Sequence, residues 1–487
     1  MRVTLLTEGT YPHAHGGVSV WCDQLVQGMP DVEFDIIAVT GTGSEPLAWE
    51  LPRQVRTVTT APLWGPPLPG KPPRGRELRR FLDAYERFLH SVLDPVYATH
   101  FGTELYGFAD FARRGLLAPA LRSEGALRTL QQVWHRPYLS TAAAEPTLHD
   151  ALHATDLLEH ALRPLVVEVP SDGVTHAVSG GLAALPGLIA AQQHNVPFLL
   201  TEHGIYLRER YLGYRTGPYR WPVKALLLGF YRMLAEESYA RAALVTPGNR
   251  YNRRWEERGG TPSENIRTVY NGVDPELFPA AGPEPELPTM SWAGRVDPIK
   301  DLETLIRAFA IVKAELPEAR LRLFGGTARG AEGYRDGCIA LAAELGLADS
   351  VVFEGRVEEI KDAYAAGSIV MLSSISEGFP FTLIEAMSSG RATVSTDVGG
   401  VREAVGDTGL VVPPREPEPM ARAALELLRD PERRAVMGAG ARIRVVEQFT
   451  LRQTIDAFRG IYAELLGEKN DENTGLTVLQ PAAEGAA

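Results

Sequence analysis

Two glutamates on either side of a short turn are the residues of this 487-residue chain whose spacing points most directly to chemistry. Residues 377–385 read Glu-Gly-Phe-Pro-Phe-Thr-Leu-Ile-Glu, after a strand-like run at 369–372 and before a helical run at 382–389. The pattern predicts a strand, a tight turn and a helix N-terminus, with Glu377 and Glu385 at the ends of the turn. A helix N-terminus suits a phosphate and carboxylates suit hydroxyls, so the segment fits a nucleotide sugar. The same spacing also fits a solvated loop glutamate followed by a surface helix glutamate.

Two cations follow a second predicted strand, at residues 291–294. Arg295 and Lys300 are five residues apart in the loop after it. Loops at the carboxyl ends of strands in open α/β sheets bind ligands, and two cations there can hold a diphosphate whose charge grows as it leaves. The alternative is an exposed basic pair, with Lys300 bound to Asp301 or Glu303.

The first half of the chain offers glycines and a histidine. Gly16 and Gly17 follow the first strand, and glycines would let the backbone approach the same phosphates. His203 comes directly after a strand at 198–201 and therefore at an edge that binds ligands. A simple glycine turn and a structural histidine are the competing interpretations.

Three blocks in the same order resemble glycosyltransferase family 4. They are residues 294–301, residues 377–385 and the glycine-rich stretch 395–403. The resemblance covers most of the chain and implies the GT-B fold, in which two Rossmann-like domains face a central cleft. It also implies transfer of a hexose with retention of anomeric configuration.

The resemblance also implies roles for single residues. Arg295 and Lys300 would clamp the donor diphosphate. Glu377 would bind the hexose hydroxyls and Glu385 the ribose hydroxyls. His203 would contact the donor hexose near the reacting centre.

The complete set of predicted site residues divides into two groups. The catalytic residues are His203, Arg295, Lys300 and Glu377. The base is expected to be read near Arg356, after the strand 351–354, although Arg356 also fits an ordinary surface residue. The substrate-binding residues are Gly16, Gly17, Arg295, Lys300, Arg356, Val357, Ile360, Glu377, Gly378, Phe379, Pro380, Phe381, Thr382 and Glu385.

Neither a metal nor another cofactor is expected in this site. The chain contains no Asp-x-Asp motif, no His-Glu-x-x-His motif, and its histidines have scattered spacings. Basic residues would then take the place of a divalent cation at the diphosphate.

A finer resemblance concerns one subgroup of family 4. The blocks 6–21 and 200–210 look like the PelF-like glycosyltransferases of exopolysaccharide synthesis, as does a long helical insertion. That resemblance implies a soluble, cytosolic enzyme that uses UDP-glucose, and a glycan or small-molecule acceptor. A membrane synthase complex is a possible partner.

Composition limits the classes of partner. The net charge of −12 argues against nucleic acid, which requires a basic footprint. No run approaches the roughly 18 to 20 apolar residues of a membrane helix, and a strand rather than a signal peptide begins the chain. Two distant cysteines favour a reducing compartment. The expected location is cytoplasmic, and peripheral association with the inner face of the membrane is left open as an alternative. The amphipathic run 221–235 is expected to face a core rather than a membrane.

Alternating strands and helices predict parallel sheets covered on both faces, which is the α/β class. The expected domains are an N-terminal Rossmann-like acceptor domain at 1–282, with a helical insertion at about 76–165, a donor domain at 283–449, a returning helix at 450–467 and a disordered tail at 468–487. Strands are predicted at residues 3–6, 34–39, 175–178, 198–201, 243–246 and 266–270, and in the second half at 291–294, 321–324, 351–354, 369–372, 392–395 and 409–412.

Two other functions remain open at this stage. A nucleotide-sugar epimerase shares the GT-B fold and would need an acid and a base at the hexose, for which His203 and Glu377 are candidates. A non-catalytic nucleotide-sugar sensor is the second alternative, and the intact set of Arg295, Lys300, Glu377 and Glu385 argues against it.

Overall fold

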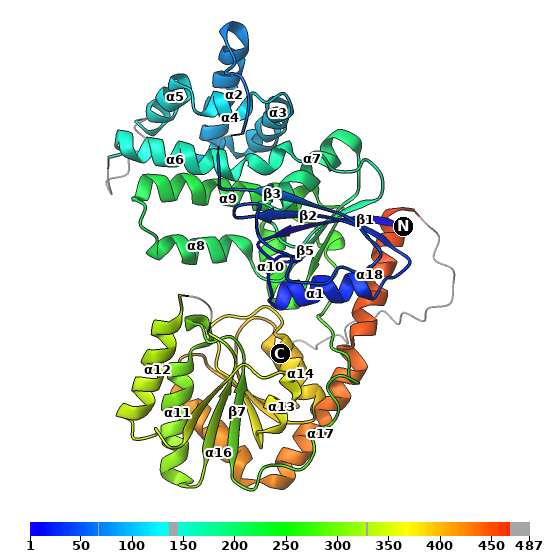
Figure 1. The fold of residues 1–487 in the computed structure, drawn as a ribbon, viewed down its shortest axis with the longest axis vertical. Coiled ribbons are helices and arrows are strands. Elements are labelled where there is room, and N and C mark those ends of the chain that lie inside the picture. The colour runs from blue at the N-terminus through cyan, green and yellow to red at the C-terminus, as the bar shows by residue number, and fades with distance from the viewer. Residues whose placement is uncertain (67, 136–144, 328–329, 468–487) are drawn as a thin grey trace, which may run out of the picture.

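Two parallel six-stranded sheets, each covered by helices, make up the molecule (Figure 1). The computed structural model describes every residue except 67, 136–144, 328–329 and 468–487. The tail that was expected to be disordered lies outside the described residues. The two sheets match the predicted GT-B architecture of two Rossmann-like domains.

The first sheet has the strand order β3-β2-β1-β4-β5-β6. Its central strands are buried runs because helices cover both faces of a parallel sheet. All five residues from Val3 to Thr7 are at most 1% exposed. The strands are β1 (Arg2–Glu8), β2 (Glu33–Thr40), β3 (Val55–Pro62), β4 (Val174–Ala177), β5 (Phe198–Glu202) and β6 (Leu244–Pro247).

Two details of this sheet differ from the sequence prediction. Strand β3 was not predicted, because it is an edge strand with a mostly exposed, polar sequence. The predicted strand at 266–270 is wrong. That segment runs beside β6, with backbone hydrogen bonds from Arg267 N to the Val245 oxygen (2.9 Å) and from Val269 N to the Pro247 oxygen (3.0 Å), but it forms only an isolated bridge.

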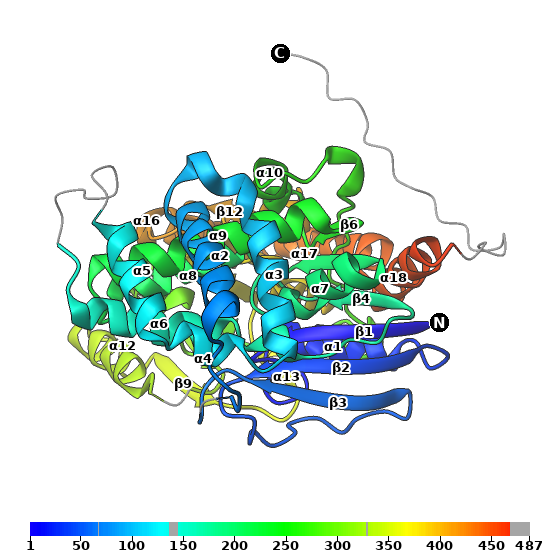
Figure 2. The same cartoon turned by 90° about the horizontal axis from the view of Figure 1, so that it is seen from above.

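Helices between β3 and β4 gather at the end of the molecule away from the second sheet (Figures 1 and 2). Helix α2 presents Phe81, Tyr85 and Phe88 to a core that also includes Leu6 and Ile37 of the sheet. The predicted helical range therefore shares one core with the first domain. Its helices are α2 (Gly75–Leu93), α3 (Phe101–Arg113), α4 (Leu117–Leu121), α5 (Glu124–Trp134) and α6 (Leu148–Ala161), with the 3-10 turns η1 (Pro95–His100) and η2 (Arg163–Val166).

The remaining helices of the first domain surround its sheet. Helix α9 buries eleven of its residues, as expected for a core-facing run. No helix in the described part of the chain is long and apolar enough to cross a bilayer. These helices are α1 (Gly17–Gln27), α7 (Ala184–His194), α8 (Tyr206–Thr216), α9 (Trp221–Arg241) and α10 (Arg250–Arg258), followed by η3 (Ser263–Asn265).

The second sheet has the order β12-β11-β10-β7-β8-β9. Its strands are β7 (Thr289–Ala293), β8 (Arg320–Phe324), β9 (Val351–Gly355), β10 (Ile369–Leu372), β11 (Ala392–Thr396) and β12 (Leu410–Val412). Its helices are η4 (Pro298–Lys300), α11 (Leu302–Glu315), α12 (Glu332–Glu344), α13 (Ile360–Ala365), α14 (Phe381–Ser388), α15 (Val401–Val405), α16 (Pro417–Arg429) and α17 (Pro431–Gln448).

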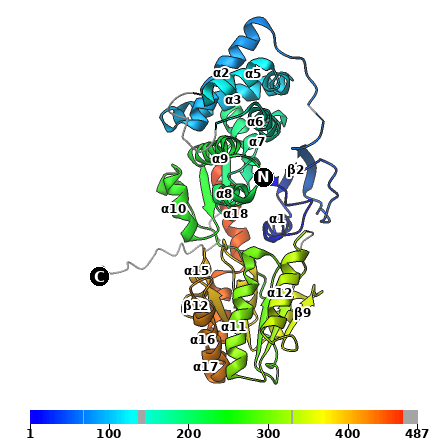
Figure 3. The same cartoon turned by 90° about the vertical axis from the view of Figure 1, so that its left-hand side faces the viewer.

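The last helix, α18 (Leu451–Leu465), runs from the second domain back to the first (Figure 3). Thr450 and Gln453 form a capping box that fixes its start. Phe458 lies in a core cluster of the first domain, and the Tyr462 hydroxyl is 2.7 Å from Nδ1 of His176 in strand β4. The first domain is therefore completed by the end of the chain.

Candidate active site in the cleft between the domains

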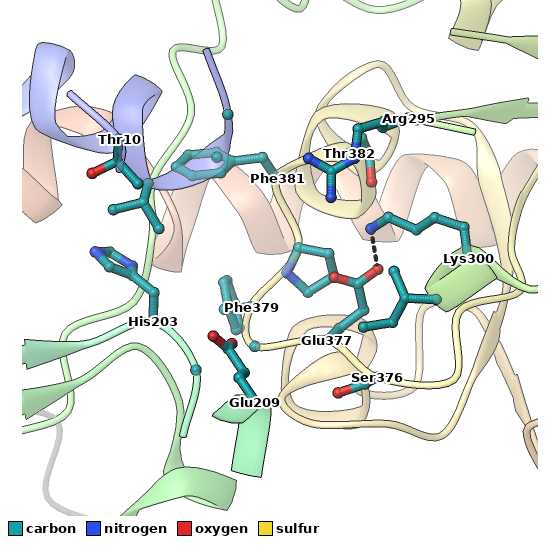
Figure 4. Close-up of a pocket in the computed structure, with 18 of the residues that line it drawn as sticks. Thr10, His203, Glu209, Arg295, Lys300, Ser376, Glu377, Phe379, Phe381 and Thr382 are labelled. Carbon is teal, nitrogen blue, oxygen red and sulfur yellow. Dashed lines mark hydrogen bonds and ion pairs between the residues drawn. The ribbon is translucent and has the colours of Figure 1, made fainter. Parts of the chain in front are cut away.

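A cleft of about 1100 Å³ lies between the carboxyl ends of the two sheets (Figure 4). Its first-domain wall comes mainly from the segments after β1, β4 and β5, and its second-domain wall from the loops after β7, β8, β9 and β10. Of the predicted site residues, those that line it are Gly16, Gly17, His203, Arg295, Lys300, Arg356, Ile360, Glu377, Gly378, Phe379, Pro380, Phe381 and Thr382.

Lys300 and Glu377 form the central contact of the second-domain wall. Nζ of Lys300 donates to Oε1 of Glu377 over 2.6 Å, and the Ser374 hydroxyl donates to the same oxygen over 2.6 Å. The two side chains are 20% and 11% exposed, so the pair is held away from bulk water at the floor of the cleft. Two partners on one oxygen fix the carboxylate in a single orientation.

The loop that carries Lys300 is bound to the loop that carries Glu377. The Ser373 hydroxyl donates to the Lys300 carbonyl (2.7 Å), and Ile375 N donates to the Ile299 carbonyl (2.9 Å). Sequence reasoning placed Lys300 and Glu377 in one site but did not predict this direct contact, because they are 77 residues apart.

Arg295 is a freer cation on the same wall. Its guanidinium lies 3.5 Å from the Asp297 carboxylate, and its side chain is 59% exposed. An exposed ion pair of this kind is weak in water, so the guanidinium is free to turn toward an anion in the cleft. Figure 4 shows Arg295 and Lys300 on the same side of the cleft as Glu377.

Helix α14 begins at the rim of this wall. No side chain caps its N-terminus, and its first turn carries no acidic residue. Free N–H groups and the positive end of the helix dipole therefore face the region beside Arg295 and Lys300. This arrangement of donors and cations suits a diphosphate.

Gly378 lets the two walls approach each other, and Gly399 packs against the Glu377 turn within the second wall. A Cβ on Gly378 would lie 1.9 Å from the His203 carbonyl oxygen, and a Cβ on Gly399 would lie 2.0 Å from the Glu377 carbonyl oxygen. Gly399 also has a φ of +56°, which disfavours other residues. By contrast, a Cβ on Gly16 would meet nothing and one on Gly17 would make only an ordinary 3.8 Å contact with Phe381.

His203 reaches the cleft from the end of β5. Its ring packs edge-on against Trp21 with 4.7 Å between ring centroids, and its Nε2 is buried with no hydrogen-bond partner among the described residues. Burial lowers the pKa of His203 to about 4, so the imidazole is neutral near pH 7. A neutral imidazole at this position can donate a hydrogen bond to a hydroxyl or accept one from it.

Glu385 and Val357 do not line the cleft. Glu385 is half-buried on α14, where the Tyr364 hydroxyl donates to its Oε2 over 2.5 Å. Burial raises the pKa of Glu385 to about 7. Contact of Glu385 with a ribose and of Val357 with a base stays a prediction.

Sequence reasoning did not assign several lining residues that the fold brings to the cleft. One signal for part of this group was available: strand β8 is followed by Gly325 and Gly326, and a Cβ on Gly325 would lie 1.6 Å from the Gly294 carbonyl oxygen. The others come from separate loops without a shared motif. They are Glu8, Thr10, His15, Ser179, Asn252, Asn271, Thr327 and Ser376. Tyr206, Arg208, Glu209 and Arg210 also line the cleft; the sequence predicted that they meet the acceptor or an anionic group, with a solvated loop as the alternative.

One group of side chains elsewhere has the spacing of metal ligands. Among the described residues, Asp156, Glu159 and His160 on α6 are the group whose ligand atoms come close enough together. Glu159 is already paired with Arg163 (3.0 Å) and Arg122 (2.8 Å), and none of the three residues lines the cleft. This group lies outside the cleft.

The fold defines a protein of GT-B architecture, with Arg295 and Lys300 at the cleft edge of its second domain. Residues 288–430 match the family model described as "Glycosyl transferases group 1". Residues 1–264, more than half of the chain, match the family model described as "Domain of unknown function (DUF3492)", and the chain belongs to that family.

Curated relatives match part of the chain. "D-inositol 3-phosphate glycosyltransferase" of Thermobispora bispora is 33% identical over 222 residues, which are 42% of this chain and 52% of that protein. "N-acetyl-alpha-D-glucosaminyl L-malate synthase" of Bacillus anthracis is 28% identical over 223 residues, 44% of this chain and 56% of that one. The chain thus spans about half the length of these relatives.

Solved structures match almost the whole fold. Sucrose-phosphate synthase from Thermosynechococcus elongatus has a TM-score of 0.63 at 19% identity and covers 96% of this chain and 99% of its own. Anabaena Alr3699/HepE in complex with UDP has a TM-score of 0.62 at 16% identity, covering 95% of this chain and 100% of its own. At these identities the likeness concerns the fold.

Proposed function

We propose that the chain is a retaining glycosyltransferase that moves a hexose, with glucose from UDP-glucose as the first choice, to a glycan or another acceptor. The observation that carries this proposal is the second-domain wall, where Lys300 holds Glu377 beside Arg295 and the uncapped start of α14. One wall thus offers cations and hydrogen-bond donors to an anion, and a carboxylate to hydroxyls. A substrate that joins a diphosphate to a sugar requires both.

The leaving group is the part of the reaction that this wall serves. The bond between the anomeric carbon and the diphosphate oxygen breaks, and its electron pair stays on the diphosphate. Arg295, Lys300 and the N–H groups at the start of α14 stabilise that growing charge. No metal ion is needed for this role in the proposed mechanism.

The sugar and the acceptor meet on the other side of the same cleft. Glu377 accepts hydrogen bonds from hexose hydroxyls, Glu385 binds the ribose, and neutral His203 lies at the reacting end. The acceptor oxygen forms its bond on the face from which the diphosphate leaves, and its proton passes to an oxygen of that diphosphate. Atoms and charge balance without another reactant.

The biological setting is part of the proposal. The PelF-like resemblance supports a role in exopolysaccharide synthesis, in the cytoplasm, alongside a membrane synthase complex. The match to the group 1 glycosyl transferases supports a transferase over an epimerase or a sensor.

NMR of the purified protein with UDP-, GDP- and ADP-sugars in EDTA tests the proposal. We expect release of a nucleoside diphosphate from one donor, without added metal. The Glu377→Gln variant should lose this release, because an amide does not replace the carboxylate that binds both Lys300 and the sugar.

The other outcomes decide between the alternatives. Conversion of the donor to its epimer would replace the transferase with an isomerase. Failure of every nucleotide sugar to bind would contradict the proposal altogether. Release that requires a divalent cation would contradict the metal-independent mechanism.

A further inference from the structure

The carboxylate of Glu209 faces the cleft from the first-domain wall. It is carried by α8, which begins three residues after His203, and a Cβ on Gly204 would lie 2.6 Å from its Oε1. Figure 4 shows Glu209 between His203 and the Glu377 turn. The structure gives Glu209 no hydrogen bond or ion pair with any described residue. Glu209 is exposed in the open cleft, and the protein around it raises its pKa by limiting the hydration of the charged form.

The neighbouring carboxylate is in the opposite situation. Glu8 accepts hydrogen bonds from Leu182 N (2.9 Å) and the Tyr206 hydroxyl (3.0 Å), and it is paired with Arg210. The carboxylate of Glu8 therefore already has its hydrogen-bond and ion-pair partners within the chain.

Arg210 is occupied as well. Its guanidinium binds Glu8 and lies over the Tyr206 ring, 4.5 Å from the ring centroid. A guanidinium held on two sides is not free to turn to an incoming anion. Arg208, which is exposed, is the remaining cation of α8 that lines this wall.

The charges of this wall indicate what it can accept. A phosphate monoester carries about −1.5 to −2 charges at pH 7. It would meet the carboxylates of Glu8 and Glu209, with Arg208 as the one cation left to bind it. A sugar hydroxyl, by contrast, gives Glu209 the hydrogen-bond donor that the chain does not supply, and such a bond to a carboxylate is charge-assisted.

We propose that Glu209 is a positioning residue for the acceptor, which is a neutral saccharide rather than a phosphorylated sugar or polyol. Its carboxylate accepts a hydrogen bond from a hydroxyl next to the one that attacks. This inference rests on the proposed function, since it needs the donor on the opposite wall. It assigns the two walls to two substrates.

The test compares Glu209→Gln with Glu264→Gln. The substitution keeps the size of Glu209 and removes its charge, and Glu264 is an exposed glutamate in η3 outside the cleft lining. With the donor identified by the nucleotide-sugar panel, transfer is measured to glucose, N-acetylglucosamine and myo-inositol, and to glucose 6-phosphate, N-acetylglucosamine 6-phosphate and inositol 3-phosphate. Saturation-transfer NMR of the UDP-loaded protein measures binding of the same six compounds.

We expect the neutral compounds to be preferred. Glu209→Gln should raise the KM for the acceptor about tenfold, with the KM for the donor and the affinity for UDP unchanged. Glu264→Gln should match the wild type. A general structural defect would change both substrates, so the split between the two KM values separates positioning from folding.

Three outcomes would overturn the inference: preference for a phosphorylated acceptor, an unchanged acceptor KM in Glu209→Gln, or neither transfer to nor binding of any neutral compound. Calorimetry with UDP separates this failure from failure of the proposed function. If the protein binds UDP and turns over the donor but fails the acceptor tests, the proposed glycosyltransferase function stands and only the acceptor assignment is wrong.

Discussion

The two sheets have the same strand order but line the cleft in different ways. Counted within each domain, both run 3-2-1-4-5-6. The edge of the second carries the charged pair of Lys300 and Glu377 and the exposed Arg295. The edge of the first carries His176 and Glu202, which are both fully buried. We call this buried pair the neutral edge; the charged residues of the first wall, on β1 and α8, are not part of it.

Burial explains the neutral edge. It lowers the pKa of His176 to about 3 and raises that of Glu202 to about 7. The Tyr239 hydroxyl donates to Glu202 over 2.6 Å, and the Thr201 hydroxyl lies 2.7 Å from Nε2 of His176. Burial thus disfavours the charged forms of His176 and Glu202, whereas Lys300 and Glu377 form an ion pair in the cleft.

The strongest way to break this comparison is to remove the cation from the charged edge. Lys300→Met should lower kcat about 100- to 1000-fold, because the charge that Lys300 faces grows toward the transition state. Turnover is measured as release of nucleoside diphosphate. Arg452→Ala, at a side chain that is 92% exposed on α18, is the control and should be unchanged. A Lys300→Met variant with wild-type kcat would remove the basis of the comparison.

The neutral edge can be tested through stability. Both carboxylate oxygens of Glu256 are buried without a hydrogen-bond partner among the described residues, and burial raises its pKa from 4.5 to about 9. The folded state keeps this proton while the unfolded state loses it above pH 4.5. The free energy of unfolding should therefore fall as pH rises from 4.5 toward 9, by roughly 2 kcal/mol between pH 5 and 7.

Glu256→Gln cannot lose that proton, so its stability should depend less on pH and should exceed that of the wild type at pH 8. Urea unfolding at pH 5, 7 and 8 measures this. Glu264→Gln should keep the wild-type slope. Equal slopes in all three proteins would mean that Glu256 is ionised in the folded state.

The contact between the two edges can be tested with a pair of glycines. Gly378→Ala should destabilise the protein by about 1 to 3 kcal/mol and weaken donor binding, because its Cβ would overlap the His203 carbonyl. Gly326→Ala also adds a methyl group to the lining of the cleft but meets nothing within 4 Å. Thermal unfolding and UDP calorimetry compare the two. Equal behaviour would show that the walls separate easily at this point.

The smallest expected effect concerns Glu385. With a pKa of about 7, its carboxylate is largely ionised at pH 8 and largely protonated at pH 6. Ribose hydroxyls donate to the ionised form, so donor affinity should fall as pH falls through 7. Glu385→Gln should bind about tenfold more weakly at pH 8. The donor affinity of the variant is divided by that of the wild type at each pH, which cancels the titration of the nucleotide itself. A ratio that does not change with pH would exclude Glu385 from the ribose site.

The second domain was the more predictable half. Strand β10 has the predicted bounds, because buried parallel strands are short apolar runs. The first domain was harder. Strand β3 is polar because it is an edge, and the strand-like segment 266–270 meets β6 only through an isolated bridge and two backbone hydrogen bonds.

The site shows the same limit. Motifs located Lys300 and Glu377 because each has local sequence signals. No local signal connects Glu8 with Arg210, which are 202 residues apart and meet only through the strand order of the first sheet. Residues that act through motifs were found, whereas residues brought together by topology were not.

The chain passes between the two domains twice, and the point where these two connections meet determines how the chain can be divided. Val273 forms a parallel bridge with Thr450, with hydrogen bonds from Val273 N to the Phe449 carbonyl (2.9 Å) and from Leu451 N to the Val273 carbonyl (2.8 Å). A chimera that exchanges the donor half should therefore replace only the segment between these crossings and keep α18 from the recipient. Cutting once, near residue 282, would combine a first domain with a foreign last helix, and Tyr462 would no longer be there to meet His176.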